Sequence, residues 1–283
     1  MAVATPGTAH RFAQVDVFTE HVLLGNALAV VFDADGLSEQ RMQAIARWTN
    51  LSETCFLLAP TDARADYRVR IFTPDRELPF AGHPTLGSCH AWLEAGGRPR
   101  GAEVIQQCGV GLVRVRRDGK RLAFAAPPLK RSGEADAATR AHVARGLRVD
   151  ESELVAVQWV DNGPGWVAAL LRDAQAVLAI EPDYAAMRPL EIGVVGAHAQ
   201  VSECAFEVRA FIPGLGSPED PVTGSLNAGL AQWLIGAGLA PPRYVASQGT
   251  RLGRAGRVHV ERLGDDVWVG GHAVTCVRGE ARF

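Results

Sequence analysis

Length, composition and charge place this chain among ordinary globular proteins and exclude several classes. Its 283 residues are 47% hydrophobic and 21% charged, which is enough material for about two domains. A net charge of -2 lacks the basic excess of nucleic-acid binders and of polybasic membrane-surface proteins. The longest apolar stretch, residues 22–32, is shorter than the ~20 residues of a membrane span, and we expect no secretory signal.

The cysteines and histidines give no support for a disulfide framework or a metal site. Five cysteines are an odd number, and none of them has CxxC spacing. The eight histidines form no HxH or HExxH pattern, so no metal ligand set is expected. We therefore expect the cysteines to be small buried residues in a reducing, cytoplasmic environment.

The apolar patterns predict a few helices and many short strands. Residues 38–49 follow the spacing of a helix capped by Ser38, and 84–95 begin with a proline suited to a first helical turn. Residues 222–237 are apolar on all sides, which predicts a buried helix, and 136–146 are a further helix candidate. The predicted strands are, in chain order, 12–18, 27–32, 56–59, 67–73, 111–116, 122–125, 154–160, 206–212, 257–261 and 267–270.

An internal repeat divides these elements into two halves. Each half runs strand, X-Pro pair, Gly-Ser pair, apolar helix with Trp-Leu, Gln/Gly turn and two strands. The corresponding segments are 69–74 and 208–213, His83-Pro84 and Asp220-Pro221, Gly87-Ser88 and Gly224-Ser225, and Trp92-Leu93 and Trp233-Leu234. Four elements in one order predict two like-folded domains, 1–128 and 129–283. Packing of the last strand on the first domain stays open.

The repeat also predicts a shared ligand site. His83 and Asp220 take equivalent places, each before a proline that opens a helix, and two helix N-termini converging on an interdomain cleft suit a carboxylate substrate. Gly87 and Gly224 lack a Cβ and would let a ligand approach the backbone. Taken singly, Asp220 reads equally as an N-cap and His83 as a loop histidine, but the matched pair favours a site.

Glu53 is the third candidate. It lies between a predicted helix and an apolar strand, where partial desolvation would raise the pKa of its carboxyl into a range suited to proton transfer. The alternative is an ordinary solvated carboxylate, which spacing alone favours. A similar segment, Ser202-Glu203-Cys204, is out of register with the repeat, so Glu203 is interpreted as incidental.

The segments around these residues resemble the PhzF family, named for the phenazine-biosynthesis isomerase. The similar segments are Val15-Asp16-Val17-Phe18-Thr19, Gly25-Asn26, Asn50-Leu51-Ser52-Glu53-Thr54, Phe72-Thr73-Pro74, the segment from Leu78 to Thr85, Arg209-Ala210-Phe211, and the segment from Glu219 to Ser225. Together they span nearly the whole chain in the family order. Ala27 and Cys89 depart from the residues common there, and neither touches the expected chemistry.

The resemblance implies the α+β fold of diaminopimelate epimerase. In that fold two pseudo-symmetric domains each form a curved or barrel-like, mostly antiparallel sheet around a central helix. It also implies a cofactor-free isomerase that forms a homodimer. Glu53 would be the acid/base, with His83 and Asp220 as its catalytic partners, and substrate would be held by Ser52, Gly82, Gly224 and Ser225.

The sequence therefore predicts a cytoplasmic, metal-free isomerase of a small carboxylate-bearing metabolite, with no nucleic-acid or membrane partner. Two alternatives stay open: an amino-acid racemase or epimerase, and a catalytically silent binding or scaffold protein on the same fold. Diaminopimelate epimerases carry cysteines where this chain has His83 and Asp220. Cys89 and Cys204 lie elsewhere, which disfavours a racemase that uses two thiols.

Overall fold

Local sequence signals fix where the longer surface helices begin. A computed structural model describes residues 7–199, 202–214 and 218–283. Helix α1 (Glu39–Thr49) starts where the Ser38 hydroxyl accepts a hydrogen bond from the Arg41 amide, as the sequence predicts, and ends at Asn50 in the left-handed conformation. Helix α3 (Ala137–Leu147) starts where the Asp136 carboxylate accepts from the Thr139 amide.

The chain divides into two compact units, residues 1–124 with 271–283 and residues 125–270. Unit 1 contains helices α1 and α2 (Gly82–Glu94). Most of its strands come from the first half of the chain. Its strands are β1 (Ala9–Val17), β2 (Asn26–Val31), β3 (Glu53–Leu58), β4 (Tyr67–Phe72), β5 (Glu77–Leu78), β6 (Val104–Cys108), β7 (Gly111–Asp118), β8 (Arg121–Ala125) and β18 (Ala273–Arg282).

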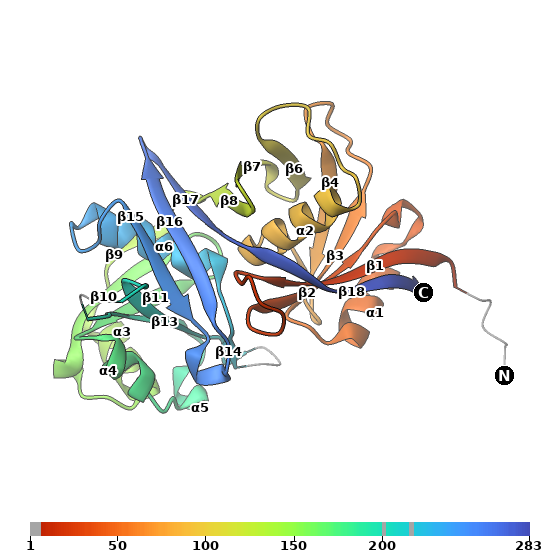
Figure 1. Cartoon of the computed structure of the whole chain (residues 1–283). Coiled ribbons are helices and arrows are strands. Elements are labelled where there is room, and N and C mark those ends of the chain that lie inside the picture. The colour runs from red at the N-terminus through yellow and green to blue at the C-terminus, as the bar shows by residue number, and fades with distance from the viewer. Residues whose placement is uncertain (1–6, 200–201, 215–217) are drawn as a thin grey trace, which may run out of the picture. The chain divides into compact units, whose positions relative to one another are not determined.

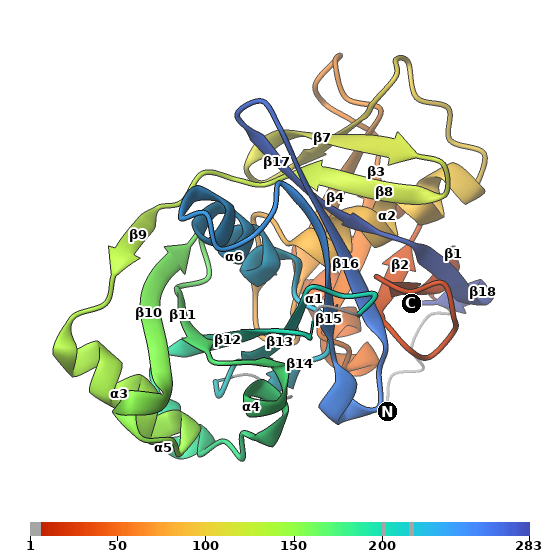
Figure 2. The same cartoon turned by 60° about the vertical axis from the view of Figure 1, so that its left-hand side comes forward.

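Unit 2 is built from one contiguous segment. Its helices are α3, α4 (Ala174–Ala179), α5 (Tyr184–Met187) and α6 (Gly224–Gly236), and α3 packs beside α5 (Figure 2). Its strands are β9 (Arg131–Glu134), β10 (Leu154–Asp161), β11 (Trp166–Leu171), β12 (Glu191–Ala197), β13 (Phe206–Phe211), β14 (Glu219–Asp220), β15 (Arg243–Gln248), β16 (Gly256–Leu263) and β17 (Asp266–Gly271).

The two units share one order of strand pairing. In unit 1, β1 pairs antiparallel with β2, β2 parallel with β3, β3 antiparallel with β4, and β4 pairs with both β5 and β6. In unit 2 the same sequence of pairings runs through β10, β11, β12, β13, β14 and β15. Each unit continues with antiparallel hairpin strands, β6–β8 or β15–β17. The predicted fold of two like, mostly antiparallel sheets is confirmed.

A buried helix lies against the sheet of each unit. Helix α2 packs on β1, β2 and β3 in unit 1 (Figure 1), and α6 packs on β10, β11 and β16 in unit 2. Most residues of both helices are buried, because each helix is apolar on several sides rather than on one stripe. The sequence predicted both helices, with starts two residues later in α2 and two residues earlier in α6 than the structure has.

The ends of the chain meet in unit 1. Strand β18 pairs antiparallel with β1 over nearly its whole length, from Ala9 opposite Arg282 to Val17 opposite Ala273 (Figure 1). The division between the units falls between Phe124 and Ala125, and the last thirteen residues, 271–283, belong to unit 1. The boundary predicted from sequence, between residues 128 and 129, assigned those residues to the second domain while leaving the place of the last strand open.

Candidate active site

Glu53 is the first residue of β3, immediately after the turn that ends α1. Its side chain is 14% exposed, so the carboxylate is largely removed from water. Strand β3 runs parallel to β2, with Glu53 opposite Leu28 in the register. The predicted position between a helix end and a buried strand is therefore present, while the role of Glu53 in proton transfer stays a prediction.

His83 lies beside Glu53 although thirty positions separate them in the chain. The Nε2 atom of His83 is 3.3 Å from Oε2 of Glu53, and the His83 side chain is 5% exposed. The side-chain amide nitrogen of Asn26 lies 3.3 Å from the other ring nitrogen, Nδ1. Burial lowers the pKa of His83 from 6.5 to about 3, so the ring is neutral at physiological pH.

Because the ring is neutral, one of the two ring nitrogens of His83 accepts a hydrogen bond and the other donates one. An amide nitrogen is a donor only, so Nδ1 accepts from Asn26 and the single ring proton lies on Nε2, which faces Glu53. A glutamate and a neutral N–H donor at this distance can bind a polar substrate group together and can exchange a proton with it. Ser52 and Gly82 are the chain neighbours of this pair, and Gly82 is the buried first residue of α2.

Asp220 is held by a buried polar network in unit 2. The hydroxyl of Thr223 donates to Oδ2 of Asp220 at 2.6 Å and accepts from Nε2 of Gln248 at 2.9 Å. The same amide nitrogen of Gln248 donates to the main-chain carbonyl of Asp220 at 3.1 Å. Oε1 of Gln248 accepts from the Thr223 amide at 3.0 Å and from the Asn227 side chain at 2.9 Å. These contacts fix the Asp220 carboxylate at the end of β14.

Gly224 and Ser225 form the start of α6. Gly224 is buried, and the hydroxyl of Ser225 accepts a hydrogen bond from the indole nitrogen of Trp166 at 3.0 Å. The main-chain carbonyl of Ser225 accepts from the Asn162 side chain at 2.9 Å. Among the described residues, neither α2 nor α6 has a side-chain cap or an acidic residue in its first turn, so the amide groups there keep their partial positive charge.

The structure corrects two details of the predicted repeat. His83 is the second residue inside α2, whereas Asp220 ends strand β14 and Pro221 precedes the start of α6. Counted from the helix starts, His83 is therefore equivalent to Ser225, and the prediction that both X-Pro pairs open helices is wrong. The reason is that β14 and the helix start are separated by a tight turn that the proline pattern alone does not reveal.

Gly87 is the second correction, because its missing side chain serves packing and not ligand access. A Cβ at Gly87 would lie 2.5 Å from Cδ2 of Leu28 and 2.9 Å from Cγ2 of Val17. Gly229, the sixth residue of α6 as Gly87 is of α2, would place its Cβ 2.3 Å from the carbonyl oxygen of Val160. Both glycines let a central helix approach its sheet closely.

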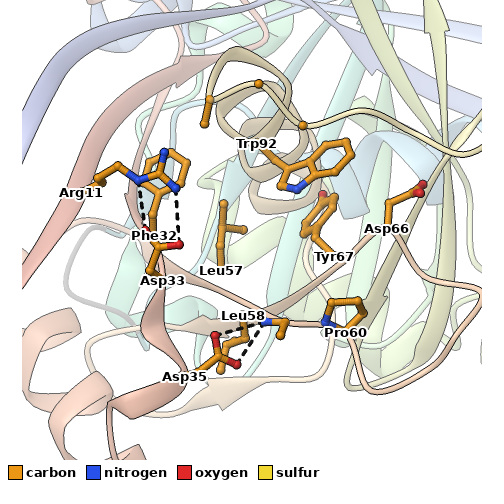
Figure 3. A pocket seen from close by; sticks show the side chains of 14 residues that line it. Arg11, Phe32, Asp33, Asp35, Leu57, Leu58, Pro60, Asp66, Tyr67 and Trp92 are labelled. Carbon is orange, nitrogen blue, oxygen red and sulfur yellow. Dashed lines mark hydrogen bonds and ion pairs between the residues drawn. The ribbon is translucent and has the colours of Figure 1, made fainter.

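Unit 1 also carries a separate surface pocket of about 390 Å³ that contains none of the predicted site residues (Figure 3). Its charged groups are already paired, since Arg11 bonds Asp33 and Asp35 accepts from the Ala59 amide. Trp92 stacks on Tyr67, and the backbone of Gly97 covers the tryptophan ring. With its charges and its aromatic face occupied, this pocket is a weaker candidate than the Glu53–His83 pair.

Comparison with known proteins identifies the family. The family profile described as "Phenazine biosynthesis-like protein", PhzC-PhzF, matches residues 15–279. The chain belongs to the PhzC-PhzF family. A relative from Schizosaccharomyces pombe, "Antisense-enhancing sequence 1", is 39% identical over 97% of this chain and 99% of its own. The trans-2,3-dihydro-3-hydroxyanthranilate isomerase of Pseudomonas aeruginosa is 33% identical over 90% of this chain and 91% of its own.

Solved PhzF structures agree with this membership. A PhzF-family protein from Enterococcus faecalis superposes with a TM-score of 0.81 at 26% identity, covering 98% of this chain and 100% of its own. Because several PhzC-PhzF relatives are named isomerases, the chain is an isomerase, as the sequence predicted.

Two further features bear on the expected partners. Within residues 7–199, 202–214 and 218–283, every helix lacks the length and apolar character that a bilayer span requires. In the same described part of the PhzC-PhzF chain, His, Cys, Asp and Glu side chains form no group of three or more that could hold a metal ion. Asn26, Trp166 and Gln248 are contacts that sequence reasoning missed, since only the fold brings them to the site.

Proposed function

We propose that this isomerase moves a proton on a small carboxylate substrate with Glu53 as its acid/base. The observation that carries the proposal is the 3.3 Å separation of Glu53 Oε2 and His83 Nε2, both on largely buried side chains. The glutamate takes a proton from one carbon and returns it to another position of an allylic system. His83 orients the substrate as a neutral N–H donor.

The second group of residues binds substrate and completes the proposal. Asp220, fixed by Thr223 and Gln248, holds the charge state of the substrate, and Gly224 and Ser225 bind its carboxylate at the start of α6. Ser52 and Gly82 play the same part beside Glu53.

The first compound to test is trans-2,3-dihydro-3-hydroxyanthranilate, the substrate in the name of the relative from Pseudomonas aeruginosa. It combines a carboxylate with an allylic ring system, which is the chemistry that one mobile proton isomerises. Incubation in deuterated water, followed by NMR, measures deuterium incorporation at carbon. Saturable binding without incorporation would favour the alternative of a silent binding protein.

Glu53→Gln is the decisive variant. It keeps the size of the side chain but removes the proton-accepting carboxylate, so turnover should fall by ~10² to 10⁴-fold while the melting temperature and substrate binding are retained. The matched control is Glu203→Gln, because Glu203 also follows a serine but its side chain is 79% exposed. Full activity of Glu53→Gln would contradict the proposal, and a parallel loss of stability would return Glu53 to a structural role.

His83→Ala and Asp220→Ala should change substrate binding and rate together, since both residues are proposed to hold the substrate. Retained binding with lost rate in either variant would move that residue from substrate binding to chemistry alone.

The thiol-based racemase is the weaker alternative on this structure. Burial raises the pKa of all five cysteine thiols, that of Cys89 to about 12. A thiol with such a pKa is protonated at neutral pH and is a poor base. The carboxylate at position 53 is therefore the better proton acceptor.

The homodimer and the independence from cofactors also belong to the proposal. Light scattering of the purified chain measures its oligomeric state. Dialysis against a chelator, followed by the deuterium assay, should leave turnover unchanged.

A further inference from the structure

Each unit makes the same kind of contact between a strand and its central helix. In unit 1, Asn26, the first residue of β2, lies 3.3 Å from Nδ1 of His83, the second residue of α2. In unit 2, Trp166, the first residue of β11, donates to Oγ of Ser225, the second residue of α6, at 3.0 Å. The strands β2 and β11 are equivalent in the shared pairing order, although the contacting residues are not in the same register. Trp166 is opposite Glu191 as Leu28 is opposite Glu53, so Trp166 corresponds to Leu28, two residues after Asn26.

Both contacts decide where a proton lies. The Asn26 amide nitrogen and the Trp166 indole nitrogen are donors only. His83 and Ser225 must accept from them, so the proton of each acceptor lies away from the strand residue. For His83 the remaining proton is on Nε2, which faces Glu53. For Ser225 the hydroxyl hydrogen is directed away from Trp166.

Burial makes the loss of either hydrogen bond unfavourable. Asn26 and Trp166 are each 2% exposed, and His83 is 4% exposed. A buried donor that loses its acceptor is destabilising, which disfavours rotating the acceptor proton toward the donor. A tryptophan and an asparagine differ in size and shape, and the property that they share here is a buried N–H group directed at the second residue of a central helix.

We propose that Asn26 and Trp166 are positioning residues, which set His83 and Ser225 as hydrogen-bond donors toward substrate. That the substrate accepts these hydrogen bonds rests on the proposed function. The positions of the protons on His83 and Ser225 do not depend on it. The proposal deepens that function by assigning the site two directed donors, a ring N–H and a hydroxyl, which fit the oxygen atoms of an anionic substrate.

The proton positions can be measured without any ligand. Nitrogen-15 NMR of the histidine rings in the wild-type chain, with His83 assigned through His83→Gln, should show Nε2 protonated and Nδ1 unprotonated. Asn26→Asp replaces the donating amide with an accepting carboxylate, so Nδ1 should gain a proton. Nδ1 protonated in the wild type, or no change in Asn26→Asp, would overturn the unit 1 assignment.

The unit 2 contact has a matching spectroscopic test. The indole N–H proton of Trp166 should exchange slowly with solvent in the wild type, and Ser225→Ala should shift its resonance and speed its exchange. The indole proton of Trp159 is the control, because that half-buried ring packs under Arg131 one strand away and should not respond. An indole resonance of Trp166 that ignores Ser225→Ala would overturn the assignment.

A double-variant cycle then connects the contact to turnover. In the deuterium assay, Trp166→Phe and Ser225→Ala should each lower kcat/KM, and the double variant should be no worse than Ser225→Ala, because Trp166 acts through Ser225. Additive losses would contradict a positioning role. If the wild type exchanges no deuterium with the test substrate, the proposed function fails on that substrate, while the two NMR experiments still decide the proton positions.

Discussion

The same arginine–glutamate hairpin occurs in both units, exposed in one and buried in the other. Arg70 of β4 bonds Glu77 of β5 with side chains 25% and 36% exposed. Arg209 of β13 bonds Glu219 of β14 with side chains 3% and 6% exposed. Each guanidinium also lies over a phenylalanine of its own strand, Phe72 at 5.1 Å or Phe211 at 4.9 Å.

The helix that follows β2 in unit 1, or β11 in unit 2, accounts for the difference. In unit 1, Glu39 at the start of α1 reaches Arg70 at 2.8 Å and leaves the pair open to water. In unit 2, the carbonyls of Val177 and Ile180 at the end of α4 accept from Arg209 at 3.3 and 2.8 Å and cover it. One hairpin thus sits at the surface and the other inside, where Glu219 anchors the neighbouring Asp220.

The largest predicted effect is the loss of the buried arginine. Arg209→Met removes the guanidinium that neutralises the buried Glu219 carboxylate, so the free energy of unfolding should fall by ~3–5 kcal/mol. Arg70→Met, the matched control, should cost only ~0–1 kcal/mol because water solvates the remaining carboxylates. Urea denaturation of both variants measures the difference, and equal losses would show that burial does not distinguish the two hairpins.

The next effect concerns the two helix glycines. Gly229→Ala should cost ~1–3 kcal/mol, because its Cβ meets the backbone carbonyl of Val160, which cannot rotate away. Gly87→Ala meets the ends of the Leu28 and Val17 side chains instead of backbone, so its neighbours can shift more easily, and alanine regains ~1 kcal/mol of helix propensity. Thermal melts of the two variants test the order, and a larger loss for Gly87→Ala would reverse it.

The last effect, which grows with each pH unit, separates the equivalent residues His83 and Ser225. Burial lowers the pKa of His83 from 6.5 to about 3, so below pH 6.5 the unfolded chain binds a proton that the folded chain does not. This contribution to stability is intact above pH 6.5 and is lost toward pH 3 by about 1.4 kcal/mol per pH unit. Glu53 is the acidic side chain that faces the ring.

His83→Gln should remove this slope from the free energy of unfolding measured between pH 6.5 and 4. Ser225→Ala, the control, should leave the slope as in the wild type, because a serine does not titrate in this range. Identical slopes in all three proteins would mean that His83 is already protonated in the folded state.

Elements with local signals could be predicted from the sequence. Ser38 caps α1 through a hydrogen bond to a residue only three positions further along the chain. The alternation of buried and more exposed residues in β1 and β4 is visible in the sequence. Strands β11 and β12 were missed because they are buried on both faces, and a continuous apolar run does not distinguish strand from helix. Strand β18 was missed because it is half-exposed and is defined by its distant partner β1.

The residues of the candidate site also fall into those that could be predicted from the sequence and those that could not. Glu53, His83 and Asp220 were found because each lies in a recognisable segment next to a helix or strand end. Asn26 lies in the Gly25-Asn26 segment of the family resemblance, but nothing in the sequence indicates its contact or that of Trp166, since their partners are 57 and 59 residues away. Their contacts depend on the register of β2 and β11 against the central helices, and only the folded chain fixes that register.

The pairing of β1 with β18 has a consequence for how the chain is made. Because Ala9 lies opposite Arg282, the sheet of unit 1 cannot close until residues 273–282 have left the ribosome. Unit 2, residues 125–270, is contiguous, so all of its residues are synthesised before the last residues of unit 1. Unit 2 is thus inserted within unit 1, so the synthesis of unit 1 starts first and ends last. A circularly permuted chain with its old ends joined and new ends between the units would make unit 1 contiguous too.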